Sequence, residues 1–131
     1  IKPANFMNHS GESVYRVMKY WKMQIKDLIV VYDDAVLDLG NIKIRSKGSS
    51  GSHNGMQSII NCLGSDQFAR VRIGIGPLPN KITMTDFVLG NFDSNEDLQL
   101  EKVVDRAVDA VESLLSVGIQ ETMNRYNNRF E

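Results

Sequence analysis

Two adjacent carboxylates, Asp33 and Asp34, directly follow the apolar run LIVVY and could take part in acid–base chemistry. Open α/β sheets place ligand sites just beyond the carboxyl ends of their strands, so an acid there could orient a histidine or hold a protonated partner. The same residues could instead form a turn, because aspartate readily bonds nearby backbone amides. Spacing alone leaves both interpretations open.

Two asparagines lie next to helix-start or glycine signals: Asn8 in FMNHSG and Asn54 in KGSSGSHNG. An asparagine side chain has a donor and an acceptor, which suits holding an amide or ester carbonyl. The structural alternatives are a helix cap for Asn8, a gap-filling role for Met7 and a mobile connector for the Gly/Ser segment. That segment lacks the lysine-and-hydroxyl ending of a P-loop, although its glycines could let the backbone approach a ligand.

Arg45 and Arg72 lie on the polar faces of two alternating segments, NIKIR and RVRIGIG. If these segments form neighbouring strands, the two guanidiniums could clamp a phosphate. The alternative is an ordinary solvated sheet face, because cations are common on exposed strands. His9 and His53 are the two histidines of the chain, and a lone histidine beside a glycine-rich loop is more often structural than catalytic.

The N-terminal half contains a helix signal followed by strand signals. Residues 9–23 place Val14, Val17, Met18 and Trp21 at the spacing of one helix face, with Ser10 as the expected N-cap. The segment DLIVVYDD indicates a buried strand that ends at its two carboxylates. NIKIR and RVRIGIG alternate as strands do, and in the second of them Arg70 and Arg72 are expected opposite Val71, Ile73 and Ile75.

The C-terminal half predicts another strand, TDFVLGNF, and then a long helix with Ser94 and Asp97 as a capping box. Gly118 is the expected stop of this helix, and a short helix IQETMNRYNN closes the chain. The long helix has an expected apolar stripe of Leu100, Val104, Ala107, Val111 and Leu114. Strands with helices between and after them predict one α/β domain over residues 1–131, with a mixed sheet.

The composition sets limits on the class of protein. The chain has 131 residues, 42% of them hydrophobic, and a net charge of −1, so any contact with nucleic acid requires a local cationic patch. A single cysteine, Cys62, excludes an internal disulfide framework and fits a reducing compartment. The aliphatic run LIVV is far too short to span a membrane, and no signal peptide is visible. We therefore expect a soluble, intracellular protein.

The order of these segments is more specific than any one of them. The segments KPANFMNHSGESV, DLIVVYDD with LDLGNIKIR, KGSSGSHNGMQSII, FARVRIGIG with DFVLGNF, and the final ETMNRYN together resemble bacterial-type peptidyl-tRNA hydrolase. The resemblance covers essentially all 131 residues, and KGSSGSHNG and RIGIG are its most specific parts. It implies a twisted mixed sheet flanked by helices, and hydrolysis of the ester between a peptide and the 3′ ribose of tRNA. Such an enzyme recycles tRNA from abandoned translation.

The resemblance also implies roles for single residues. Asp33 would orient the catalytic histidine, Asn8 and Asn54 would bind the peptide and the scissile carbonyl, and Met7 would line the pocket. The remaining roles are contacts with substrate by the gating loop at Gly51 and Ser52, a structural role for His53, and a clamp for the tRNA 5′ phosphate at Arg45 and Arg72. The implied site needs no metal and no cofactor, and the implied partner is the acceptor stem and 3′ end of peptidyl-tRNA, with no membrane.

One departure from the family concerns the catalytic histidine, which the family carries in an N-terminal segment near a Gly-Asn-Pro-Gly turn. Nothing here matches that segment, and His9 falls where the family tends to have an apolar residue. We therefore expect that an N-terminal segment is missing, either present as a separate chain or lost from a fragment, and that this chain alone is inactive. Val36 takes a place that is often acidic.

Two further expectations accompany the resemblance. The alternative to an enzyme is a noncatalytic RNA-binding relative, similar to a plastid splicing cofactor, although a pure binder would not require Asn8, Asp33 and Asn54. The expected location is the cytoplasm, or an organelle if the source is eukaryotic.

Overall fold

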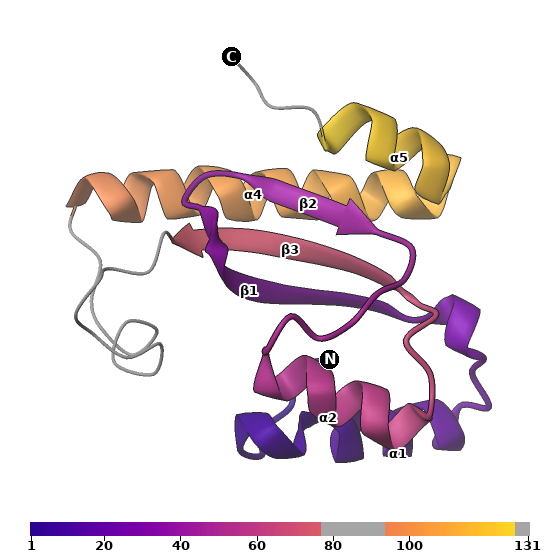
Figure 1. The fold of residues 1–131 in the computed structure, drawn as a ribbon. Helices are drawn as coiled ribbons and strands as arrows, with labels where there is room; N and C mark the ends of the chain where they lie inside the picture. The colour runs from indigo at the N-terminus through magenta and orange to yellow at the C-terminus, as the bar shows by residue number, and fades with distance from the viewer. Residues whose placement is uncertain (77–93, 128–131) are drawn as a thin grey trace. The chain divides into compact units, whose positions relative to one another are not determined.

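The computed structural model describes residues 1–76 and 94–127, without the side chains of residues 94–97. These residues form two compact units, Ile1–Ile29 with Ser46–Ala69, called here the helical unit, and Val30–Arg45 with Arg70–Glu131, called the sheet unit. Figure 1 shows the helices and strands of each. The predicted strand TDFVLGNF and the predicted capping box lie outside the described residues and side chains.

The helical unit consists of two helices that pack side by side (Figure 1), α1 at Ser10–Tyr20 and α2 at Asn54–Leu63, with the short 3₁₀ turns η1 (Met7–His9) and η2 (Ile25–Asp27). A Cβ on Gly11 would lie 2.1 Å from the backbone oxygen of Ser58, so the helices approach more closely than any side chain at Gly11 would allow. The Gly11 amide also donates to Ser58 Oγ at 2.9 Å. Four apolar side chains of the helix pair are buried: Val14, Met18, Met56 and Ile59.

Two predictions for α1 are wrong at its ends. Trp21 is 69% exposed rather than part of the apolar stripe, because the helix ends at Tyr20 and the chain turns away there. Ser10 is not the N-cap: His9 holds that position, and the Ser10 hydroxyl donates backward to the Met7 carbonyl oxygen at 2.7 Å.

The sheet has three strands in the order β1 (Ile29–Asp38), β3 (Ala69–Gly76), β2 (Ile42–Arg45). Strands β2 and β3 are antiparallel, with Lys43 opposite Arg72 and Arg45 opposite Arg70. β1 and β3 run in the same direction (Figure 1), and their carboxyl ends meet where the Leu39 amide donates to the Gly76 carbonyl oxygen at 2.8 Å. The predicted α/β fold with a mixed sheet is confirmed. The single domain over residues 1–131 stays a prediction.

Two glycines of the RIGIG segment let the end of β1 cross β3. A Cβ on Gly74 would lie 2.0 Å from the Asp38 carbonyl oxygen, and one on Gly76 would lie 1.9 Å from the Ala35 carbonyl oxygen. Real Cβ atoms do not approach an oxygen so closely, so both positions require glycine for reasons of space. The chain then makes a tight turn, in which the Asn41 amide donates to the Asp38 carbonyl oxygen at 3.1 Å, and enters β2.

Two predictions for the sheet need correction. β1 does not end at its carboxylates but continues through Asp33 and Asp34 to Asp38. β1 is not fully buried either, since Val31 is exposed. The face that carries the arginines is solvated only in part, since Arg45 is exposed and Arg70 is only 1% exposed. The alternation in NIKIR is confirmed, with Ile42 and Ile44 buried and Arg45 exposed.

Helices α4 (Ser94–Val117) and α5 (Ile119–Tyr126) pack against each other and against β2 (Figure 1). Gly118, with φ of 87°, separates the two helices as predicted. The buried stripe of α4 is Val103, Ala107 and Ala110, whereas Val104 of the predicted stripe is exposed. The Asn127 side chain donates to the Ile44 carbonyl oxygen at 2.9 Å and accepts from the Ile44 amide at 2.7 Å, so one side-chain amide pairs with strand β2 as a neighbouring strand would.

Within residues 1–76 and 94–127, no helix combines the length and the apolar character that crossing a lipid bilayer would demand.

Candidate functional site

The helical unit brings together two of the predicted segments, because η1 contacts α2. η1 carries Met7 and Asn8, and α2 begins at Asn54 directly after His53. Both segments meet over Gly55, where an added Cβ would lie 2.6 Å from Met7 Sδ and 3.0 Å from His53 Cε1. The absence of a side chain at Gly55 thus allows the methionine sulfur and the imidazole ring to pack at the start of α2.

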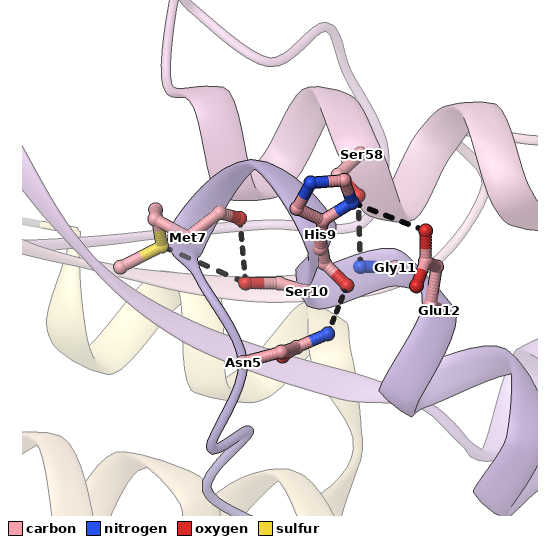
Figure 2. A network of polar contacts seen from close by, with 7 residues as sticks. All are labelled: Asn5, Met7, His9, Ser10, Gly11, Glu12 and Ser58. Atoms are coloured by element: carbon pink, nitrogen blue, oxygen red, sulfur yellow. Dashed lines mark hydrogen bonds and ion pairs between the residues drawn. The ribbon is translucent and has the colours of Figure 1, made fainter.

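Hydrogen bonds beneath η1 hold this short turn in place, as Figure 2 shows. The Ser10 hydroxyl donates to the Met7 carbonyl oxygen and lies 3.7 Å from Met7 Sδ. The Asn5 side-chain amide donates to the His9 carbonyl oxygen at 2.6 Å, and Gly11 is bonded to Ser58 of α2. The position of η1 is therefore fixed by groups other than Asn8.

The side chains of Asn8 and Asn54 are both exposed. Among the described residues, no hydrogen bond or ion pair engages either side-chain amide. Each amide keeps its donors and its acceptor for a ligand, whereas the neighbouring polar groups of Ser10 and His53 are already used.

The loop before α2 makes a turn with two consecutive left-handed residues, Gly51 with φ of 57° and Ser52 with φ of 68°. The His53 amide donates to the Ser50 carbonyl oxygen at 3.1 Å and closes the turn, as in a type I′ turn. The Ser50 hydroxyl, in turn, donates to Gln57 Oε1 at 2.8 Å. Glycine adopts a left-handed conformation freely, but Ser52 does so at an energetic cost, which is a common feature of ligand-contacting loops.

Both histidines of the chain have defined contacts. His53 Nδ1 accepts a hydrogen bond from the Met56 amide at 3.1 Å and so caps α2, which places any proton of the neutral ring on Nε2. His9 Nδ1 faces Glu12 Oε1 (Figure 2) at a distance of 3.1 Å, and both side chains are about half exposed.

The sheet unit places a group of charged residues on one face of the sheet. Paired residues of an antiparallel ladder share a face, so Lys43, Arg45, Arg70 and Arg72 lie on the same side of β2 and β3. Arg72 Nε donates to Asp34 Oδ2 at 2.6 Å, and a second guanidinium nitrogen contacts the same oxygen. Asp34 Oδ1 also accepts from the Val36 amide at 2.9 Å. Asp34 is therefore held from two directions.

Tyr32 joins this face two residues before Asp34, and its hydroxyl is hydrogen-bonded to the Arg70 side chain. Burial raises the pKa of the Tyr32 hydroxyl above its ordinary value of 10.0, and the positive charges of Arg72 and Arg70 oppose that rise. Tyr32 consequently remains a neutral hydroxyl at physiological pH.

Asp33 lies on the opposite face of β1 from Asp34, because successive strand residues alternate. It is partly buried and takes part in a polar or electrostatic interaction. Asp33 belongs to the sheet unit together with Arg45 and Arg72, whereas Met7, Asn8, Gly51, Ser52, His53 and Asn54 belong to the helical unit.

The structure places Met7 against Gly55 at the start of α2, and η1, which also carries Asn8, contacts α2. Arg45 and Arg72 lie on neighbouring strands but not opposite each other, since Arg45 faces Arg70 and Arg72 faces Lys43. The sequence pattern did not identify Asp34 as the partner of Arg72. Aligning NIKIR with RVRIGIG as a ladder would have placed the four cations together, but only the pairing register identifies their neighbours.

Within the described ranges, no group of three or more His, Cys, Asp or Glu side chains is arranged to hold a metal ion.

In a comparison with known protein families, residues 1–131 match the family described as Peptidyl-tRNA hydrolase. A peptidyl-tRNA hydrolase of Lachnospira eligens is 45% identical over 127 residues, covering 97% of this chain and 68% of the relative. Those of Gloeobacter violaceus and Thermoanaerobacter sp. are 45% and 47% identical, and the chain covers 65% and 68% of their lengths. The chain thus spans about two thirds of the length of these curated relatives.

Solved structures agree with the sequence comparison. The crystal structure of peptidyl-tRNA hydrolase from Acinetobacter baumannii superposes with a TM-score of 0.85 at 30% identity, covering 94% of this chain and 62% of that one. A peptidyl-tRNA hydrolase in complex with N-propanol gives the same TM-score, identity and coverage.

Proposed function

The chain belongs to the peptidyl-tRNA hydrolase family, and from this premise we propose that its residues serve the hydrolysis of the ester bond between peptide and tRNA in peptidyl-tRNA. This reaction would recycle tRNA during translation. The observation that carries the proposal is the pair of exposed amides, Asn8 and Asn54, on the contacting elements η1 and α2. Their side chains are unengaged among the described residues, while the backbone that carries them is held from beneath.

In this proposal the two amides bind the peptide and the scissile carbonyl. Donors that are fixed before the reaction stabilise the negative charge that develops on the carbonyl oxygen when water attacks. Met7 lines the pocket with its sulfur over Gly55, and the turn at Gly51 and Ser52 contacts the substrate. Asp33 is the acid that orients the catalytic histidine.

The catalytic histidine is assigned to neither His9 nor His53. The Nδ1 atom of His53 accepts from the Met56 amide, and that of His9 faces Glu12, so each ring has a local structural contact. We propose that the base is a histidine outside residues 1–131, which another chain or a further segment supplies, and that these 131 residues alone hydrolyse little or no substrate.

Arg45 and Arg72 are proposed to contact the 5′ phosphate of the tRNA. Arg45 is exposed, and Arg72 is 28% exposed with Asp34 as its partner. Lys43, opposite Arg72, adds a further positive charge to the same face. A local group of cations of this kind would allow a chain of net charge −1 to bind RNA.

Binding and hydrolysis test the assignment separately. The 131-residue chain is titrated with a peptidyl-tRNA analogue whose ester is replaced by an amide, and hydrolysis is measured on the natural gene product. Asn8→Ala and Asn54→Ala should each weaken analogue binding relative to deacylated tRNA and lower kcat by about 10²–10³, which is typical for the loss of one oxyanion donor. Asp33→Ala should lower kcat without changing analogue binding.

Asn61→Ala is the control, because Asn61 is an exposed asparagine near the other end of α2, where its Oδ1 accepts from Gln57 Nε2 at 2.9 Å. It should leave binding and turnover unchanged. Full activity in both the Asn8 and the Asn54 variant would contradict the proposal. Tight binding of tRNA by a natural gene product that hydrolyses no ester would favour the noncatalytic RNA-binding alternative.

A further inference from the structure

The carboxyl end of α1 carries an unusual residue for its backbone conformation. The Met23 amide donates to the Met18 carbonyl oxygen at 2.8 Å and the Lys22 amide to the Lys19 carbonyl oxygen at 3.3 Å, which is the hydrogen-bond pattern of a Schellman motif. Lys22 is the left-handed residue of this motif, with φ of 52°. Glycine is the residue usually found at this position, because a Cβ is disfavoured there.

A lysine at this position costs stability that a glycine would not. A side chain retained in a disfavoured conformation is a common sign of a role outside the fold. α2 provides a comparison within the same unit, since its corresponding left-handed residue is Gly64, with φ of 67°. One helix of the pair thus ends with the expected glycine and the other with a cation.

Lys22 lines a hollow of about 430 Å³ within the helical unit. Lys19 also lines this hollow, and its ammonium group is 5.9 Å from the centre of the Tyr15 ring. Its apolar part is formed by Met18, Met23, Ile25 and Leu63. The hollow therefore combines an apolar surface with two cations.

The residues between the two lysines add exposed aromatic surface. Tyr20 is 77% exposed and Trp21 is 69% exposed, with ring centres 5.1 Å apart and planes at 82°. Arg16, Lys19, Lys22 and Lys26 lie in a stretch that has no acidic residue between Glu12 and Asp27. A chain of net charge −1 therefore concentrates positive charge and aromatic rings around the end of α1.

We propose that this surface, defined by Tyr15, Lys19, Tyr20, Trp21 and Lys22, is a second RNA-binding site, separate from the residues assigned to hydrolysis. The lysine ammonium groups bind phosphates, and an unpaired base stacks on Trp21 or Tyr20. The choice of tRNA as the RNA rests on the proposed function.

The surface suits RNA better than a lipid bilayer. A helix that lies on a membrane buries its own apolar face in the lipid. In α1 that face is already used, because Val14 and Met18 are buried in the helical unit. What remains exposed is a short group of rings between cations, which is the composition of surfaces that bind single-stranded nucleic acid.

Trp21 is the one tryptophan of the chain, so its fluorescence reports on this surface without a label. The probe is deacylated tRNA, titrated into the 131-residue chain at several salt concentrations. We expect quenching of Trp21 and an affinity that falls with salt. Lys22→Gln should weaken binding about threefold to tenfold and reduce the salt slope by about 1.

Lys22→Gly is the sharper variant, since it removes the cation and also relieves the left-handed conformation. It should weaken tRNA binding as Lys22→Gln does while its Tm stays equal or rises. Lys102→Gln, an exposed lysine of α4, makes the same change in net charge and should leave Trp21 quenching nearly unchanged. Equal affinities for the Lys22 and Lys102 variants would overturn the proposal, as would a Trp21 response to anionic phosphatidylserine vesicles but not to tRNA.

Failure of this inference can be told apart from failure of the proposed function. Lys22→Gln in the natural gene product should leave hydrolysis of a minimal aminoacyl ester unchanged, because that substrate lacks the tRNA body. If the minimal ester is hydrolysed but the Lys22 variants bind tRNA normally, only this second site is wrong. If no ester is hydrolysed while Trp21 quenching depends on Lys22, the second site stands and the proposed function is wrong.

Discussion

The two candidate amides of the helical unit and the charged residues around Asp34 in the sheet unit differ in whether their side chains have partners. In the helical unit, Asn8 and Asn54 are exposed and no described residue engages their side chains, while Gly11, Ser10 and Ser58 hold the backbone beneath them. In the sheet unit, by contrast, the polar side chains hold one another. Arg72 is bonded to Asp34, and the buried Arg70 is bonded to Tyr32.

Stability and function can therefore be separated at some of these residues and not at others. An exposed amide without a partner contributes little to folding, so its replacement should change binding and leave stability alone. A partly buried ion pair cannot lose one member without leaving the other uncompensated. Variants of Asn8 and Asn54 should therefore change activity and leave stability alone, whereas a variant of the Asp34–Arg72 pair should lose stability.

Gly11→Ala should destabilise the protein most, because it removes the support beneath η1. The added Cβ would lie 2.1 Å from the backbone oxygen of Ser58, so α1 and α2 would have to move apart. We expect a loss of about 3 kcal/mol in the free energy of unfolding, at the upper end of the range for overpacking. Urea unfolding followed by circular dichroism measures it.

Gly64→Ala is the control in the same unit. Gly64 has φ of 67° but nothing within 4 Å of an added Cβ, so only the conformational cost of about 1 kcal/mol is expected. Equal losses for the two variants would mean that the close approach of the helices does not stabilise the helical unit.

The second prediction compares the stability of two variants, one from each unit. Asp34→Ala removes the partner of Arg72 and the acceptor for the Val36 amide, and the side chains of Asp34 and Arg72 are only 12% and 28% exposed. We expect a loss of about 2 kcal/mol, the usual size for a hydrogen bond to a charged group. Asn54→Ala should change stability by less than about 0.5 kcal/mol, as is usual for surface substitutions. Chemical unfolding measures the free energy of unfolding of both variants. Equal losses in the two variants would contradict the comparison.

The sequence predicted the strands of the sheet unit better than their ends. The alternation in NIKIR correctly placed Ile42 and Ile44 inside and Arg45 outside. The end of β1 was misplaced at Asp33 and Asp34, because the strand continues only where Gly74 and Gly76 let it cross β3. That crossing joins segments far apart in the chain, and local pattern does not contain it.

The buried face of α4 was also predicted only in part. Ala107 was correctly predicted to be buried, whereas Val104 is exposed. Val103 and Ala110 are buried instead, because the apolar stripe is shifted by one residue from the predicted one. For the candidate site, spacing left the roles of Asn8 and Asn54 open, since 46 positions separate them in the sequence. The family resemblance supplied the pairing of their segments, and the contact between η1 and α2 supports it. The role of Asp33 beside these amides stays a prediction.

A smaller effect is expected for His53→Ala, which tests whether a polar side chain of the helical unit can contribute to stability. His53 Nδ1 accepts from the Met56 amide and caps α2, so its loss should cost about 1 kcal/mol. His53→Asn should restore most of this, because asparagine is a good N-cap. Thermal unfolding measures the three proteins. The contrary outcome is that His53→Ala also abolishes hydrolysis in the natural gene product and His53→Asn does not restore it. A structural role alone would then not explain the effect of His53 on hydrolysis.

The smallest effect concerns the pH dependence that Tyr32 gives to the sheet unit. Burial raises the pKa of Tyr32 in the folded state above 10.0, so above about pH 10 the unfolded chain loses this proton while the folded chain retains it. The unfolded state then binds fewer protons than the folded state, and stability falls as pH rises through the pKa of the folded protein. Below that range Tyr32 contributes no pH dependence. Tyr32→Phe should therefore reduce the alkaline loss of stability, by at most about 1.4 kcal/mol per pH unit. Urea unfolding at several alkaline pH values, with phenolate absorbance of both proteins as a direct readout, tests this. An equally steep loss in Tyr32→Phe would show that the polar network around Arg70 does not depend on a neutral tyrosine.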